Sequence, residues 1–125
     1  MIKSPKPAFE KIEPGFGSSF SYRTYDENHE NNSHNFWHYH PELELVYVKG
    51  GTGKRQVGSH ISYYRNGELI LIGSNLPHCG FTDSLNNYER ETVIQMRPDF
   101  LGESFFNIPE MRSIKALFER AKMGI

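Results

Sequence analysis

The run His38-Tyr39-His40-Pro41-Glu42-Leu43-Glu44 opens the most informative stretch of this chain, and Gly67-Glu68-Leu69-Ile70-Leu71-Ile72, followed by Pro77-His78, closes it. Two histidines two positions apart on a strand leave the same face of a sheet. A bend at Pro41 can bring Glu44 back toward this pair, and His78 follows a second strand-like run. Three imidazoles and one carboxylate suit a first-row metal ion, with positions left for water or a small molecule.

The composition predicts one domain with a core of its own. The chain has 125 residues, of which 37% are hydrophobic and 14% aromatic, so we expect a core built largely from Phe and Tyr. The formal net charge of −1 lacks the basic footprint of a surface that binds nucleic acid by itself. The single cysteine, Cys79, excludes an internal disulfide and favours a reducing compartment.

The sequence shows no sign of a membrane or secretory segment. It contains no run of about 18 apolar residues, the length that a spanning helix needs. The first seven residues lack the apolar segment of a secretory signal. We therefore expect a cytoplasmic protein with no membrane partner.

Short strand-like segments separated by turn residues fill most of the chain. Residues 18–25 alternate as a half-buried strand does, and residues 68–72 form the clearest buried strand. Residues 49–53, Lys-Gly-Gly-Thr-Gly, predict one hairpin turn, and Asn66-Gly67 predicts a second of type I′. No crossover of helix length lies between the strands, which favours an antiparallel barrel or sandwich.

The pattern becomes helical after Arg97-Pro98. Residues 99–106 predict one or two helical turns, and a firmer helix begins at Pro109. Apolar residues at helical spacing follow in that helix: Met111, Ile114, Leu117, Phe118 and Ala121. We expect this stripe to pack on the sheet, with a partner surface as the alternative. The expected organisation is an arm and first strand at 1–17, a barrel at 18–97 and a helical segment at 98–125.

Two segments resemble motifs of a known family. His38-Tyr39-His40, Glu44 and Gly51 resemble the first cupin motif, and Gly67 with Pro77-His78 resembles the second. With their flanking residues they are similar to the N-terminal sensor domain of AraC-type transcription regulators. Residues 100–125 resemble the segment that follows the barrel in that family. The resemblance implies an all-β, cupin-like double-stranded β-helix (a jelly-roll barrel) followed by one or two C-terminal helices.

The departures from the cupin motifs bear on function. Asn32 stands where the first motif has glycine, Gly73 and Asn75 where the second has proline and glycine, and Thr82 where it has asparagine. Such relaxed turns are common in regulatory cupins. The resemblance therefore implies a small-molecule-sensing domain of a transcription regulator and no enzyme, with no catalytic residue assigned. Two alternatives stay open, a metal-dependent cupin enzyme of the dioxygenase or isomerase type and a plain interaction or storage barrel.

By similarity to metal-binding cupins, the candidate ligands are His38, His40, Glu44 and His78. The implied cofactor is one divalent transition metal ion: Zn, Ni, Fe or Mn. Two other interpretations stay open, a polar pocket for an organic effector without metal and a scatter of structural histidines. The expected partners are a small-molecule effector and a second copy in a homodimer. The resemblance implies that DNA is recognised by a C-terminal helix-turn-helix domain, which we expect to be absent from this chain, so we expect no direct binding of nucleic acid.

The remaining cysteine and histidines are expected to be structural. Cys79 should point away from its neighbour His78 on the same strand, as a small buried or edge residue. His29, His34 and His60 have no partner at ligand spacing and should be exposed.

Overall fold

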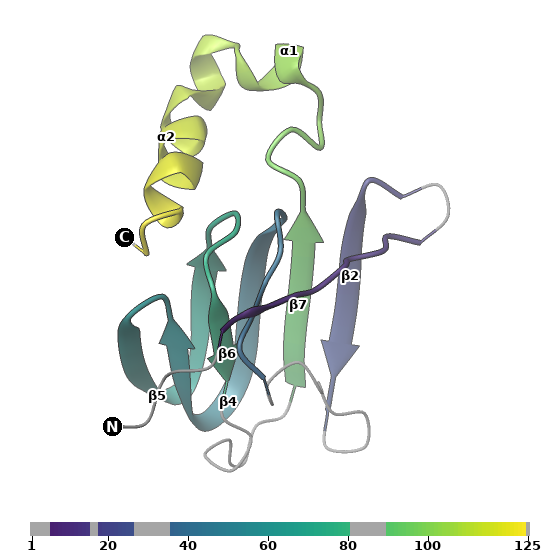
Figure 1. Ribbon diagram of the computed structural model, residues 1–125. Coiled ribbons are helices and arrows are strands. Elements are labelled where there is room, and N and C mark those ends of the chain that lie inside the picture. Colours follow the sequence, from purple (N-terminus) through teal and green to yellow (C-terminus); the bar gives the residue numbers. More distant parts are fainter. Residues whose placement is uncertain (1–5, 16–17, 27–35, 81–89, 125) are drawn as a thin grey trace.

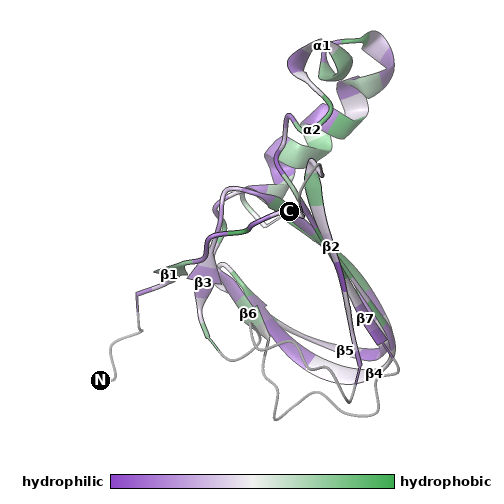
Figure 2. Ribbon diagram, turned by 90° about the vertical axis from the view of Figure 1, so that its right-hand side faces the viewer, coloured by the Kyte–Doolittle hydropathy of each residue, from purple (hydrophilic) through white to green (hydrophobic). Residues whose placement is uncertain are grey.

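A computed structural model describes residues 6–15, 18–26, 36–80 and 90–124. Its strands are β1 (Ala8–Phe9), β2 (Phe20–Tyr25), β3 (His38–Tyr39), β4 (Leu43–Val57), β5 (His60–Ile72), β6 (His78–Gly80) and β7 (Arg90–Met96). They form one sheet in the order β1-β3-β6-β4-β7-β2, with β5 paired to β4 (Figure 1). The sheet curls strongly, with β3 and β6 on one side and β4, β5 and β7 on the other (Figure 2). The predicted all-β jelly-roll fold is confirmed.

The long strand β4 connects the two parts of the curled sheet. Its first half pairs antiparallel with β7 from Leu43 to Lys49, and its last residues, Arg55 to Val57, pair with β6. Strand β5 runs beside it on both sides of the bend, from Glu44 to Val57. The bend in β4 therefore determines how the sheet folds over.

The glycines at 50 and 51 form this bend, and the hairpin turn predicted at residues 49–53 is wrong. The pairing of β4 with β5 shifts register between Lys49 and Thr52, opposite Asn66-Gly67. Gly50, Gly51, Asn66 and Gly67 all have positive φ, between 56° and 89°. The type I′ turn predicted at Asn66-Gly67 is wrong as well. Residues with positive φ occur in a β-bulge as well as in a reverse turn. The hairpin reverses instead at Gly58-Ser59.

Aliphatic residues, with one tyrosine, form the core between the strands. Val46, Val48, Tyr64, Ile72 and Val93 make up the buried cluster. The expectation of a core built largely from Phe and Tyr is wrong, because strand alternation turns many aromatic rings outward. In β2 the rings at positions 20 and 22 are 42% and 60% exposed, whereas the small side chain between them, Ser21, is buried.

Helical segments follow β7, as the sequence predicts. They are α1 (Glu103–Phe106), a 3-10 turn (Pro109–Met111) and α2 (Arg112–Ala121), and they extend beyond one end of the sheet (Figure 1). Ala121, at the end of α2, is buried, and its backbone lies against Gly73, which has no side chain to keep it away. Ile114 and Leu117 remain 40% and 39% exposed, so the expectation that the whole stripe packs on the sheet is wrong. None of the described helices is long and apolar enough to span a bilayer.

Candidate functional site

The structure brings the four predicted site residues together inside the curled sheet. His38 lies in β3, His40 directly after it, Glu44 in β4 and His78 in β6. His38 and His78 face each other in the antiparallel pairing of β3 with β6. All four side chains are buried, with residue exposures of 7% or less. Residues distant in the sequence thus meet because three strands converge at this point.

The histidines are close enough to share one ion. The ring centroids of His38 and His78 are 4.3 Å apart, those of His40 and His78 5.0 Å, and those of His38 and His40 5.9 Å. One ring nitrogen from each histidine lies within 4.8 Å of the others. Imidazole nitrogens bind Zn, Cu, Fe and Ni, so this spacing suits a transition metal ion.

Backbone carbonyls orient all three rings. Nδ1 of His38 lies 2.9 Å from the carbonyl oxygen of Phe36, Nδ1 of His40 lies 3.0 Å from that of Glu42, and Nδ1 of His78 lies 2.8 Å from that of Leu76. A carbonyl oxygen only accepts hydrogen bonds, so each Nδ1 carries a proton and donates. In a neutral ring the lone pair then lies on Nε2. This is how metal-binding histidines are commonly held in proteins.

Glu44 lies between two of the imidazoles. Its Oε1 is 3.1 Å from Nε2 of His40 and accepts a hydrogen bond of 2.8 Å from the side-chain amide of Gln95. Burial alone would raise the pKa of Glu44, but the hydrogen bond from His40 and the neighbouring His78 hold it well below the usual value. Glu44 is therefore a buried carboxylate that stays ionised.

The surroundings of His38 and His40 shift the pKa values of the two histidines in opposite directions. Burial lowers the pKa of His38, and the adjacent His78 lowers it further. Burial opposes the proton on His40 as well, but the hydrogen bond and charge of Glu44 outweigh burial and raise its pKa. Glu44 thus favours the protonated form of His40, whereas burial favours the neutral form of His38.

Nε2 of His78 is buried with no hydrogen-bond partner among the described residues. Its nearest carboxylate oxygen, Oε2 of Glu44, is 3.6 Å away, which is too long for a hydrogen bond. Buried polar atoms in native proteins are nearly always paired with protein, water or an ion. The unpaired nitrogen faces the other imidazoles, so the donor set fits a divalent metal ion.

The turn before His78 is hydrogen-bonded to the bend after β3. The backbone N–H of Asn75 donates to the carbonyl oxygen of His40 at 2.8 Å, and the Ser74 hydroxyl donates to that of Pro41. Asn75 adopts a positive φ of 60° to make this contact. These bonds fix the segment that leads into β6 relative to the first two histidines.

Gln95 is a site residue that the sequence analysis missed. It lies in β7, is 8% exposed and donates to Glu44. The alternating pattern of the strand could have indicated Gln95, because this residue occupies an inward position between Val93 and the end of β7. A polar residue at such a position needs a buried partner, but the sequence does not say which one.

His60 is exposed, as predicted, and Cys79 is buried. Cys79 pairs with Gln56 and His78 with Val57, so the cysteine and the histidine leave opposite faces of β6, as expected. His29 and His34 lie outside the described residues.

A second polar cluster lies inside the sheet beyond the bend. Arg55 is 4% exposed, and its Nε donates to Oε2 of Glu68 at 2.8 Å. The guanidinium lies 5.9 Å from the ring centre of Tyr64. Burial, opposed by the charge of Arg55, raises the pKa of Tyr64 to about 12. The Tyr64 ring lies over Gly53, where a Cβ atom would come within 2.3 Å of its oxygen.

This cluster predicts an alkaline transition. The folded-state pKa of Tyr64 lies above the ordinary value of 10.0, so its contribution to stability is complete below pH 10.0 and is lost as the pH rises through about 12. An ultraviolet titration of tyrosinate should show a component near pH 12 that Tyr64→Phe removes. Tyr63→Phe, at a ring that is 74% exposed, serves as the control and should leave that component in place. Persistence of the component in Tyr64→Phe would contradict the assignment.

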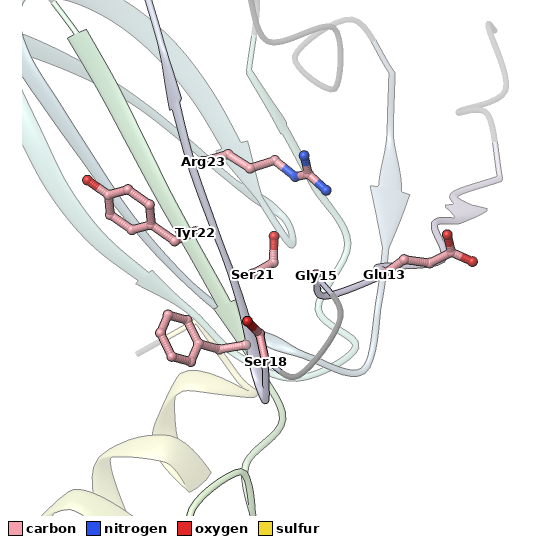
Figure 3. Close-up of a pocket in the computed structure, with 7 residues that line it drawn as sticks. Glu13, Gly15, Ser18, Ser21, Tyr22 and Arg23 are labelled. Carbon is pink, nitrogen blue, oxygen red and sulfur yellow. The ribbon is translucent and has the colours of Figure 1, made fainter.

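An open hollow of about 580 Å³ lies beside β2, away from the histidines. It is lined by Glu13, Gly15, Ser18, Phe20, Ser21, Tyr22 and Arg23. Tyr22 and Arg23 project to opposite sides of the strand (Figure 3). The lining contains none of the four predicted site residues, so the convergent buried groups identify the histidine cluster as the better candidate.

Comparison with known proteins agrees with the fold and with the sequence motifs. The family model for the AraC-like ligand binding domain matches residues 20–122, which include every strand from β2 to β7 and the helices α1 and α2. No curated protein matches the chain. The match spans most of the chain and includes all four candidate site residues, and the chain therefore belongs to the family of AraC-like ligand binding domains.

Proposed function

We propose that this chain is the small-molecule-sensing domain of a transcription regulator, and that His38, His40, Glu44 and His78 hold one divalent transition metal ion in its effector pocket. The observation that carries the proposal is the buried Nε2 of His78, which lacks a hydrogen-bond partner among the described residues and faces two further imidazoles. The membership of the chain in the AraC-like ligand binding family supports the sensing role.

In this proposal the ion supplies a Lewis-acidic centre for an oxygen or nitrogen atom of the effector. The protein's own part is to orient the ligands. The carbonyl oxygens of Phe36, Glu42 and Leu76 keep a proton on each Nδ1, and Gln95 holds the carboxylate of Glu44. Binding of the effector then shifts the population between two arrangements of the domain.

Metal analysis of protein purified without an affinity tag or added metal tests the proposal. We expect about one ion per chain, held by three imidazoles and one carboxylate. His38→Ala is the preferred variant because its loss leaves the hydrogen bond between His40 and Glu44 intact. It should weaken binding by more than the roughly 10–100-fold that loss of an outer hydrogen-bond partner costs. His60→Ala, at an exposed histidine, is the matched control and should bind like the wild type.

A metal content near zero, unaltered by added Zn, Ni or Mn, would refute the metal centre. The four residues would then be the polar lining of a pocket for an organic effector. The same result would remove the alternative of a metal-dependent cupin enzyme of the dioxygenase or isomerase type, which depends on the same ligands.

We further propose that a separate helix-turn-helix domain of the regulator contacts DNA in the cytoplasm, and that the sensing domain acts as a homodimer. The net charge of −1 supports DNA binding by a separate domain, because DNA binding requires a cationic surface. A mobility-shift titration of this chain at low salt should show no specific complex. Sequence-specific retention of duplex DNA would contradict this assignment.

A further inference from the structure

The strand β1 brings a carboxylate to the histidine cluster. It pairs in parallel with β3, Ala8 opposite His38 and Phe9 opposite Tyr39. The N–H of Ala8 donates to the carbonyl oxygen of Trp37 at 3.0 Å, and that of Glu10 donates to the carbonyl oxygen of Tyr39 at 2.9 Å. This register places Glu10 opposite His40.

Strand alternation then determines which face Glu10 occupies. Side chains at every second position leave the same face, so Glu10 lies on the face of His38 and His40. Glu10 is half-buried. The pairing of β1 with β3 therefore brings this carboxylate to the histidine side of the sheet.

A further negative charge would stabilise a bound dication. Among the candidate ligands only Glu44 is anionic, so three neutral imidazoles and Glu44 leave a dication half compensated in a buried site, which is costly. Glu42 lies 3.9 Å from Nδ1 of His40, on the side of the ring that faces away from the shared nitrogens. Glu10 is a further carboxylate on the histidine face.

We infer that Glu10 is a further residue of the metal site, where its carboxylate stabilises a bound divalent ion and so joins occupancy of the site to pairing of β1 with β3. This inference rests on the proposed function, since it requires that the histidines bind metal. Coupling between two equilibria is reciprocal. If paired β1 tightens metal binding by some factor, the bound ion stabilises paired β1 by the same factor.

The matched variants are Glu10→Gln and Glu13→Gln, which remove the same charge three residues apart on the same segment. Glu13 is 74% exposed, and its partner is Lys11 at 3.4 Å. Titration with Zn²⁺ against a chromophoric chelator should show binding about tenfold weaker in Glu10→Gln. Glu13→Gln should match the wild type, and Glu10→Asp, which keeps the charge, should retain most of the affinity. Circular dichroism verifies that each variant is folded.

Hydrogen exchange provides the second readout. In the wild type, Zn²⁺ should slow exchange of the Ala8 and Glu10 amides, which donate to the carbonyl oxygens of Trp37 and Tyr39, and Glu10→Gln should lose this protection. If the wild type binds Zn²⁺ and Glu10→Gln binds it equally well, the role of Glu10 is refuted while the proposed metal site stands. If the wild type binds neither Zn²⁺ nor Ni²⁺ nor Mn²⁺, both fail.

Discussion

Replacing Arg55 with methionine should lower the free energy of unfolding by about 3–5 kcal/mol. Arg55 lies on β4 beyond the bend, and its partner Glu68 lies on β5 on the other side, so their 2.8 Å hydrogen bond spans the inside of the bend. The side chains are only 4% and 17% exposed. Without the guanidinium, the carboxyl group of Glu68 stays in a largely buried place with its hydrogen-bond donor and counter-ion removed. Urea denaturation followed by circular dichroism measures the loss.

The double variant Arg55→Met/Glu68→Met separates charge from packing. Replacing both members of a buried ion pair by apolar side chains of similar size is often neutral or stabilising. We therefore expect the double variant to regain most of the stability that the single variant loses. A double variant as unstable as Arg55→Met would show that packing of the arginine stem, including its contact with Tyr64, accounts for the effect.

Replacing Gly67 with alanine should cost about 2–5 kcal/mol, from left-handed strain together with steric overlap. Gly67 has φ of 89°, and a Cβ atom there would lie 2.3 Å from the carbonyl oxygen of Val48 and 3.0 Å from the backbone nitrogen of Gly50. Both neighbours are backbone atoms of β4 at the bend, so neither can rotate away. The measurement is again the free energy of unfolding in urea.

Gly124→Ala is the matched control for backbone strain. Gly124 also has a positive φ, of 78°, but the nearest atom to its Cβ position is a Leu76 methyl carbon at an ordinary 3.8 Å. Its replacement should therefore cost only the strain, about 1–2 kcal/mol. Equal losses in the two variants would mean that the close approach of β4 and β5 at Gly67 contributes nothing.

The convergence of the four candidate site residues could be predicted because the information is local. The two-residue spacing of His38 and His40 places both on one face of a strand, and the motif resemblance supplied His78. Gln95 and Glu10 could not be found in this way. Both reach the site through strand pairing, β7 beside β4 and β1 beside β3, and pairing of distant segments leaves no mark in the local pattern.

The strands were easier to predict than the places where the chain reverses. Gly50-Gly51 and Asn66-Gly67 carry strong turn signals, yet they lie opposite each other within two long strands. A positive φ is needed in both situations, so the residue type does not distinguish a bulge from a hairpin turn. The core was misjudged because composition alone does not say which face of a strand is buried. Tyr22 and Tyr63, for example, lie mostly in solvent.

Strand β4 pairs with β5, β6 and β7, and this position also implies an order in which the strands pair during folding. Strands β4 and β5 are neighbours in the chain and reverse at Gly58-Ser59, so they can pair without closing a long loop. The pairing of His38 with His78 joins segments on either side of that whole hairpin and carries a larger loop-closure entropy. We expect the hairpin to form first and the histidine cluster last. A ligand bound by residues that come together late stabilises the native state but not the transition state for folding. It should therefore lower the unfolding rate and leave the folding rate nearly unchanged.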